Sequence, residues 1–248
     1  METKIWYLKQ CHLFDGLTAA EAARLDQRAL VRNHARSDLI YSPTEPGQSI
    51  LLLARGRVKI KNLTYDGKET ILAFIEEGEV FGELALLEDD LRQDYAEAAT
   101  ACTVLLLPRQ ELLELMANRP EIALSVTKLI GLRRRRVENR LSNILFLSSR
   151  DRMVRLLAEL AENYGQWTAG RCQIRLKLSH QDLAGLIGVT RETATLTLTQ
   201  LRAEGLIQID RRQITVLQPD RLVAGGRATD ERRPSQVHRP PVTSGRFS

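Results

Sequence analysis

The 248-residue sequence predicts an α+β chain with an antiparallel β domain, a long helix and a C-terminal winged helix-turn-helix. Three observations predict it. Between residues 38 and 107, glycines recur in steps of 9, 11 and 11 and separate short β-rich runs, as in an antiparallel sandwich or barrel. Residues 121–147 contain no proline and carry apolar residues at 3- and 4-residue steps. The pattern of residues 179–216 predicts two short helices separated by a turn at one glycine, followed by a hairpin.

The β domain shows strand alternation and turn signals. The run RVKIK predicts one apolar and one solvent-facing side, because Val58 and Ile60 alternate with Arg57, Lys59 and Lys61. Asp66-Gly67 lies between two such runs and predicts a short hairpin turn.

Helical segments flank the β domain. Residues 16–30 are rich in helix formers, and Thr18 precedes Glu21 at the spacing of a capping box. After residue 108 the apolar spacing becomes helical again, which predicts a short helix that ends near Pro120.

The segment 121–147 predicts a helix of about 40 Å. Its apolar seam contains Val126, Ile130, Arg133, Val137, Leu141 and Ile144. One domain rarely needs so long a helix for its own core, so we expect it to pair with a second copy of the chain. The alternative is packing against the β domain of its own chain. The run 133–136 (RRRR) predicts a solvated surface with one arginine at the edge of the seam.

The C-terminal part begins with an amphipathic helix and continues into the helix-turn-helix. Ser179 precedes Asp182 at capping-box spacing, Gly188 marks the turn, and Thr190 is placed to cap the second helix. The second helix has a predicted buried stripe of Ala194, Leu198 and Leu201 and ends at Gly205. Residues 207–216 then predict the hairpin of the wing.

The exposed face of the second helix predicts contact with DNA. Arg191 and Glu192 stand at its start, where side chains reach base edges when a helix enters the major groove. Leu196 lies off the buried stripe and is expected to face DNA as well; packing under the wing or against the first helix is the alternative. Short polar residues at helix N-termini suit phosphate oxygens, namely Ser179, Gln181 and Thr190.

Charge and cysteine usage agree with this interpretation. Residues 1–147 hold 20 Lys and Arg against 21 Asp and Glu, whereas 148–223 hold 11 against 8 and 224–248 hold 5 against 2. The basic excess lies in the last two segments, which favours a polyanionic partner there.

Three scattered cysteines indicate a reducing compartment, and each cysteine is expected to be a small buried residue. Their spacing offers no metal site. No apolar run could span a membrane, and no signal peptide is recognised, so we expect a cytoplasmic protein.

The sequence resembles the Crp–Fnr family of cyclic-AMP-receptor-like bacterial transcription regulators over roughly residues 8–222. GVTRETATLTLTQLRAEGLI is similar to the family's recognition helix. VFGELALL, followed by Arg92, resembles its phosphate-binding cassette. The resemblance implies a β domain of the double-stranded β-helix (jelly-roll) type at 1–119, a dimerisation helix at 120–147 and a winged helix-turn-helix at 148–223. Residues 224–248 are expected to form a disordered basic tail.

The cassette implies an effector site at Gly82, Glu83, Leu84, Arg92 and Gln93. In family members that bind cyclic nucleotides, the arginine and backbone N–H groups hold the phosphate and the glutamate holds the ribose. Those members follow the arginine with Ser-Ala or Thr-Ala, whereas this chain has Gln93 and Asp94. A cyclic-AMP-like nucleotide, another small molecule or no effector therefore all stay open. An ion pair of Arg92 with Asp89, Asp90 or Asp94 is the structural alternative.

The expected function is a dimeric regulator that binds a pseudo-palindromic site on double-stranded DNA and works with RNA polymerase. The alternative is a cyclic-nucleotide-binding regulatory protein that uses the cassette at 82–92. An enzyme is not expected, because the sequence contains no recognised catalytic motif.

Overall fold

The structure is a computed structural model, and it describes residues 4–9, 11–63, 65, 69–87 and 91–222. The chain divides into two compact units: Met1–Leu145 with Ala184–Gly188, and Phe146–Leu183 with Val189–Ser248. The predicted turn Asp66-Gly67 and the predicted tail 224–248 lie outside the described residues.

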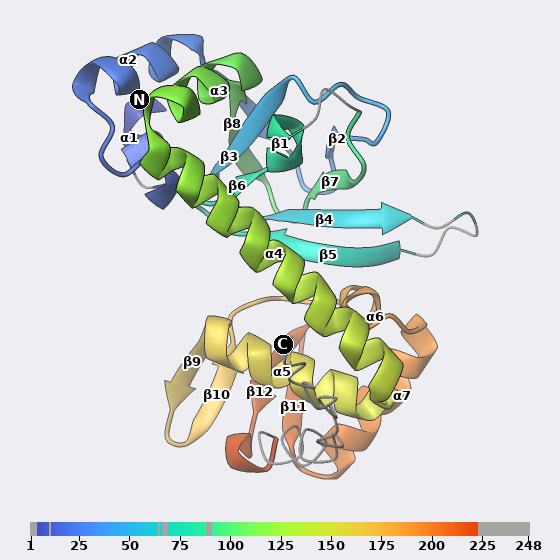
Figure 1. Cartoon of the computed structure of the whole chain (residues 1–248). Helices are drawn as coiled ribbons and strands as arrows, with labels where there is room; N and C mark the ends of the chain where they lie inside the picture. Colours follow the sequence, from blue (N-terminus) through green and yellow to red (C-terminus); the bar gives the residue numbers. More distant parts are fainter. Residues whose placement is uncertain (1–3, 10, 64, 66–68, 88–90, 223–248) are drawn as a thin grey trace, which may run out of the picture. The chain divides into compact units, whose positions relative to one another are not determined.

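Two antiparallel four-stranded sheets form the β domain of the first unit (Figure 1), with strand orders β1-β8-β3-β6 and β2-β7-β4-β5. Consecutive strands change sheet at every step except the β4–β5 hairpin. This is a jelly-roll, so the predicted double-stranded β-helix is confirmed. The strands are β1 (Leu30–His34), β2 (Leu39–Tyr41), β3 (Ser49–Arg55), β4 (Val58–Leu63), β5 (Glu69–Ile75), β6 (Val80–Phe81), β7 (Tyr95–Ala98) and β8 (Cys102–Pro108).

Strand β3 separates two apolar cores. Leu51 and Leu53 belong to the core between the sheets, together with Phe81. Ile50 and Leu52 belong to a second core on the other face, where helices pack. Burial on both faces explains the unbroken apolar run of this strand, because neither side of it meets water.

Helices cover the outer face of that sheet. The Thr18–Glu21 capping box forms as predicted: the Glu21 N–H donates to Thr18 Oγ1 at 3.3 Å, and the Thr18 N–H donates to the Glu21 carboxylate at 2.8 Å. The helices of this unit are α1 (Lys4–Lys9), the 3₁₀ turn η1 (His12–Phe14), α2 (Ala19–Arg28), the 3₁₀ turn η2 (Glu83–Leu86), α3 (Arg109–Asn118) and α4 (Pro120–Phe146).

Strand β4 corrects the prediction of a solvent-facing lysine side. Lys59 and Lys61 have side chains only 11% and 12% exposed. Each ammonium group pairs with the carboxylates of Glu69 on β5 and Glu97 on β7, with three of the four contacts between 2.9 and 3.3 Å and the fourth joining Lys61 and Glu97. The prediction is wrong because β4 is a central strand whose two neighbours each place an acid beside the lysines.

Helix α4 divides its apolar seam between two environments. Val126 is 2% exposed in the core of its own domain, and Ile130 packs against that core. Further along, Val137, Leu141 and Ile144 are 50%, 56% and 41% exposed. The first half of the seam therefore packs against its own domain, which is the alternative that the sequence left open. The second half stays half-exposed.

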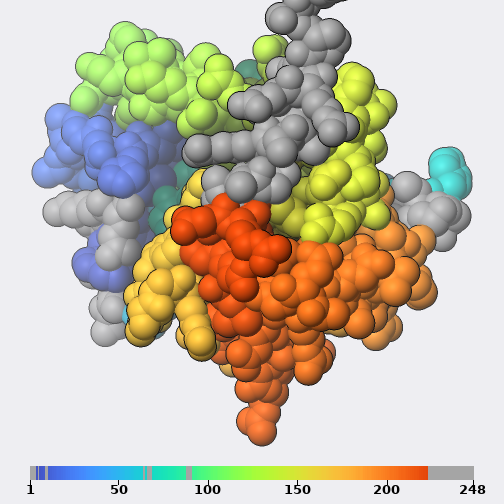
Figure 2. Space-filling model, turned by 90° about the horizontal axis from the view of Figure 1, so that it is seen from below, coloured from blue at the N-terminus to red at the C-terminus, as the bar shows by residue number. Residues whose placement is uncertain are grey.

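The second unit contains a four-stranded antiparallel sheet, β11-β12-β10-β9, together with helices α5 and α7 and the start of α6, whose residues from Ala184 on are assigned to the first unit. Figure 2 shows the β9–β10 hairpin in gold beside the red-orange strands β11 and β12. This hairpin was not predicted, because its first strand is polar and its turn is Ala169-Gly170 rather than a common turn pair. The elements are α5 (Ser149–Tyr164), β9 (Gly165–Thr168), β10 (Arg171–Ile174), α6 (His180–Ile187), α7 (Arg191–Ala203), β11 (Ile207–Asp210) and β12 (Gln213–Val216).

The cysteines are buried, as predicted, and burial raises the pKa of Cys11 to about 11. Within the described ranges, no cluster of three His, Cys, Asp or Glu side chains is arranged to hold a metal ion. No helix of the described chain has both the length and the apolar character needed to cross a bilayer.

Candidate functional site

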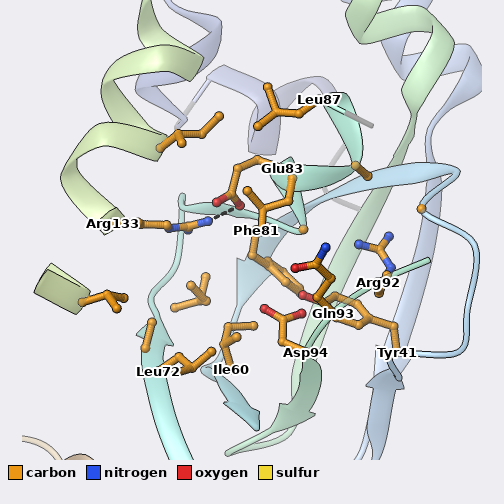
Figure 3. Close-up of a pocket in the computed structure, with 18 of the residues that line it drawn as sticks. Tyr41, Ile60, Leu72, Phe81, Glu83, Leu87, Arg92, Gln93, Asp94 and Arg133 are labelled. Atoms are coloured by element: carbon orange, nitrogen blue, oxygen red, sulfur yellow. Dashed lines mark hydrogen bonds and ion pairs between the residues drawn. The ribbon is translucent and has the colours of Figure 1, made fainter. Parts of the chain in front are cut away.

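A cavity of about 460 Å³ lies in the first unit between the jelly-roll domain of strands β1–β8, called the β-roll below, and α4 (Figure 3). Its volume is in the range of small-molecule sites. Its wall is mostly apolar, with charged groups from η2, from α4 and from the segment just before β7. All five residues predicted for the effector site line it: Gly82, Glu83, Leu84, Arg92 and Gln93.

Glu83 is held in the cavity wall by an arginine that the sequence did not assign to the site. Arg133 of α4 donates to the Glu83 carboxylate and to the backbone carbonyl of Val80. The side chains of Glu83 and Arg133 are 7% and 20% exposed. The predicted solvated surface therefore holds for residues 134–136, which are exposed, and Arg133, which the sequence placed in the apolar seam, is the arginine that turns inward. The buried carboxylate draws Arg133 inward, because an unpaired charge there would be costly.

Arg133→Ala is expected to lower the free energy of unfolding by about 3 kcal/mol, because it leaves Glu83 buried without its charge partner. Urea denaturation followed by circular dichroism measures this. Arg135→Ala on the exposed face of the same helix is the matched control and should change stability by no more than about 0.5 kcal/mol. Equal effects of the two substitutions would show that the Glu83–Arg133 pair contributes nothing.

Arg92 is committed to groups of its own domain. Its Nη2 donates to the Ser49 carbonyl at 2.6 Å, and its guanidinium carbon lies 4.0 Å from the centroid of the Tyr41 ring. Gly82 has φ +69°, a backbone conformation that favours glycine, and a Cβ there would lie 2.4 Å from Arg92 Nη1 and displace the guanidinium. The contacts with Ser49 and Tyr41 replace the predicted alternative of an ion pair with Asp94. Asp89 and Asp90 lie outside the described residues.

Asp94 and Tyr41 are cavity residues that the sequence did not place in the site (Figure 3). Burial raises the pKa of Asp94, and the negative charge of Glu83 adds to the rise. The Tyr41 hydroxyl and the nearby guanidinium groups oppose it. The only sequence signal for Asp94 is its position two residues after Arg92, and Tyr41 lies 51 positions before Arg92.

The helix-turn-helix of α6 and α7 has the predicted caps. The Asp182 N–H donates to Ser179 Oγ at 3.1 Å, and the Ser179 hydroxyl donates to the Asp182 carboxylate at 2.6 Å. The Thr193 N–H donates to Thr190 Oγ1 at 3.3 Å. Gly188 has a φ of +67°, as the turn between α6 and α7 requires. These local bonds begin both helices where the sequence predicts.

Helix α7 has one buried and one exposed face. Its stripe of Ala194, Leu198 and Leu201 is at most 1% exposed, as predicted. The opposite face forms a shallow hollow lined by Arg191, Glu192, Thr195, Leu196 and Thr199. Leu196 is 62% exposed, so the alternative that it packs under the wing or against the first helix is wrong.

Two further features bear on this face. Hydrogen bonding to its own backbone N–H and to the Thr190 hydroxyl lowers the pKa of Glu192, so its carboxylate stays ionised as an acceptor.

At the tip of the β11–β12 wing, Arg211 and Arg212 both have positive φ, 45° and 70°, as in a type I′ turn. Both side chains are exposed. The sequence predicted this turn without assigning its arginines to the site.

Two family models match the chain. The model of the cyclic nucleotide-binding domain matches residues 31–119, and the model of the Crp-like helix-turn-helix domain matches residues 151–224.

Relatives and solved structures match both units at once. A "CRP-like cAMP-activated global transcriptional regulator" of Mycobacterium tuberculosis is 26% identical over 89% of this chain and 98% of its own length. A "Global nitrogen regulator" of Synechococcus elongatus is 31% identical over 76% of this chain and 86% of its own length. The structure of the "c-di-GMP Responsive Global Regulator CLP" of Xanthomonas campestris superposes with a TM-score of 0.71 at 25% identity, covering 80% of this chain and 99% of that one.

The family models and relatives cover the β-roll with its cavity and the winged helix-turn-helix with its exposed polar face. The chain therefore belongs to the Crp–Fnr family of DNA-binding transcription regulators.

Proposed function

We propose that this protein is a homodimeric, sequence-specific transcription regulator of the bacterial cytoplasm whose DNA binding is controlled by a small molecule in the β-roll. The observation that carries the proposal is the exposed face of α7, where Arg191, Glu192 and Leu196 lie together opposite a buried stripe. In this proposal residues 1–119 sense the effector, 120–147 dimerise and 148–223 bind DNA, with RNA polymerase as a further partner.

The side chains at the start of α7 suit base edges in the major groove. The Arg191 guanidinium can donate two hydrogen bonds to one guanine, and the ionised Glu192 can accept from a cytosine amino group. Leu196 has no donor, but it can contact a thymine methyl group. Together they define a short half-site in which one G·C pair is recognised by hydrogen bonds from charged side chains and the neighbouring base pair by apolar contact.

The three residues proposed for phosphate contacts differ in what they can offer. The Ser179 proton is already donated to Asp182, so this hydroxyl contributes mainly by starting the helix. The Thr190 hydroxyl lies 3.1 Å from the Thr193 hydroxyl, accepts from the Thr193 N–H and bonds to the Glu192 carboxylate, so it too is engaged at the start of its own helix. Gln181 is exposed, and its amide is the strongest side-chain donor of the three. Such contacts position the protein without reading sequence.

The dimer is proposed from the half-exposed seam of α4. Val137, Leu141 and Ile144 recur at steps of 4 and 3, which places them on one side of the helix. Pairing these residues with a second copy would remove from water the apolar surface that the home domain leaves open. A two-fold dimer then presents two helix-turn-helix units to half-sites about 34 Å apart.

Relatives indicate that effector chemistry varies within this architecture. The Mycobacterium tuberculosis relative is described as cAMP-activated, and the Xanthomonas campestris structure as c-di-GMP-responsive. A cyclic nucleotide is therefore the alternative effector for the cavity. A cyclic-nucleotide-binding module without its own DNA site is the alternative function, and the winged helix favours the regulator over it.

A gel shift of the full chain on genomic fragments, with and without cyclic AMP and cyclic GMP, tests the proposal. We expect a subset of fragments to be retarded at nanomolar protein in about 0.15 M salt, against micromolar binding of random DNA. Equal affinity for all fragments would refute sequence-specific regulation. Absence of any DNA complex, together with nucleotide binding, would favour the module.

Leu196→Arg is expected to add a preference for guanine at the base pair that Leu196 faces, worth about 1–3 kcal/mol. The 62% exposure of Leu196 means that the longer side chain does not disturb the core. Selection of binding sites from random DNA by wild type and variant measures the change. An unchanged consensus from a variant that still folds and binds DNA would contradict the orientation assigned to α7.

A further inference from the structure

The turn at the tip of the wing consists of two arginines in a backbone conformation that disfavours them. Asp210 pairs with Gln213 at the end of the β11–β12 ladder, so Arg211 and Arg212 alone form the loop. Both have positive φ, 45° and 70°. A type I′ turn favours Asn-Gly, because glycine is unstrained in the left-handed region and asparagine tolerates it better than other side chains do. The hairpin is therefore less stable with two arginines than with Asn-Gly.

No contact of either arginine within the described part of the chain offsets this strain. Neither guanidinium has a hydrogen bond or an ion pair there, and both side chains are exposed. Other arginines of the same unit are anchored: Arg150 donates to Glu204 at 2.5 Å, and Arg221 donates to Gln218 at 2.8 Å. A strained turn whose side chains have no internal partner indicates a role in binding.

The base of the wing is bonded to the end of α7, the helix proposed to enter the major groove. The Leu206 N–H donates to the Leu201 carbonyl at 3.1 Å, and the Leu217 N–H donates to the Leu206 carbonyl at 2.8 Å. From Ile207, the four residues of β11 span about 13 Å to the tip, at about 3.3 Å per residue. This length is enough to cross one sugar-phosphate backbone from the major groove, which is about 12 Å wide, to the adjacent minor groove.

The chemistry of the tip suits a narrow minor groove. Two guanidinium groups face one neighbouring carboxylate, that of Asp210, so the tip has an excess of positive charge. Arginine is more weakly hydrated than lysine and is attracted by the enhanced negative potential of a narrow groove. A·T-rich segments narrow the minor groove, whereas a G·C pair places the 2-amino group of guanine in it.

We infer that the tip formed by Arg211 and Arg212 enters the minor groove beside each half-site and gives the protein a preference for A·T pairs there. The inference rests on the proposed function, since it adds a second DNA-contacting element to the same domain. The preferred A·T pairs should lie about half a helical turn, about 5 base pairs, from the pair that Arg191 reads.

Three duplexes test the inference on the full-length protein. They share the half-sites that the wild type selects from random DNA and differ in these neighbouring pairs, which are A·T, G·C or inosine·C. Inosine lacks the 2-amino group, so an inosine·C pair has the major groove of G·C and a minor groove like that of A·T. Fluorescence anisotropy measures the affinities. We expect the wild type to bind the A·T and inosine duplexes alike and the G·C duplex about tenfold or more weakly.

The double variant Arg211→Asn/Arg212→Gly should bind all three duplexes more weakly than wild type, with affinities that agree within about twofold. Because Asn-Gly is the favoured type I′ pair, its melting temperature should rise by about 2–4 °C, so the weaker binding does not come from a damaged fold. The control Arg32→Gln/Arg36→Gln removes two positive charges from exposed side chains of the first unit and should keep the wild-type preference.

Four results would overturn the inference: equal wild-type affinity for the three duplexes, inosine duplexes bound as weakly as G·C duplexes, a preference that survives in Arg211→Asn/Arg212→Gly, or DNA binding by this variant equal to that of wild type. The last result would assign the arginines to an acidic protein surface instead. If the wild type selects half-sites but gives any of these results, only the role of the wing is wrong. If it selects no site at all, the proposed regulator is wrong.

Discussion

Leu141→Asp is expected to give a monomer that binds the specific DNA site about 100-fold or more weakly than wild type. In the proposed dimer, Leu141 lies in the seam between two α4 helices, where a carboxylate would have to be buried without a partner. A monomer binds each half-site independently and loses the 10²- to 10⁴-fold gain, to order of magnitude, that comes from linking two binding units. Sedimentation equilibrium at micromolar protein and a gel shift measure the two effects.

Leu132→Asp is the matched control for this prediction. Leu132 and Leu141 are 57% and 56% exposed, so neither substitution creates a hole in the core. They are nine residues apart, which places them on opposite faces of a helix with 3.6 residues per turn. Leu132→Asp should stay dimeric and bind DNA normally. If Leu141→Asp remained a dimer, or if both variants became monomers, the proposed seam would be wrong.

Arg191→Ala is expected to weaken binding of the specific site by about 1–3 kcal/mol per half-site, hence about 2–6 kcal/mol for two half-sites. The loss should be confined to sequences with the guanine that Arg191 reads, because its paired hydrogen bonds distinguish that base. Random DNA should be bound with affinity changed by at most the loss of one positive charge per subunit. Quantitative gel shifts on the specific and a scrambled fragment measure both.

Gln181→Ala provides the comparison that separates base reading from phosphate contact. Its amide can donate to phosphate, so the substitution should weaken specific and scrambled fragments alike. The ratio of the two affinities should therefore fall for Arg191→Ala and stay constant for Gln181→Ala. Equal losses on both fragments from both variants would show that the roles of Arg191 and Gln181 are not distinct.

The helix-turn-helix was predictable because its signals are local. A cap bonds to an N–H three residues away, as Thr190 does to Thr193, and the turn glycine needs only its own positive φ. The buried stripe of α7 follows from helical periodicity alone. The same periodicity placed Leu196 on the exposed face, and the structure confirms that placement.

The environment of the cassette was less predictable. The sequence marked Glu83 and Arg92 as site residues, but Arg133 lies 50 positions from Glu83 and Tyr41 lies 51 positions from Arg92. Helical spacing placed Arg133 in the apolar seam and so set it apart from its three neighbours, but spacing within one helix does not identify Glu83 as its partner. The same limit explains Lys59: period-two alternation separates two faces of a strand but does not say what covers each face.

The sequence by itself determined the α+β class, the long helix, the winged helix-turn-helix and the residues that α7 exposes. Each depends on hydrogen bonds and apolar spacing within about one or two turns of the chain, so neighbouring residues carry the information. Only the tertiary structure decided that Arg92 is committed to Ser49 and Tyr41, and that Asp94 faces an apolar cavity. These facts depend on which strands and helices meet in space, and burial makes the resulting charge pairing obligatory rather than optional.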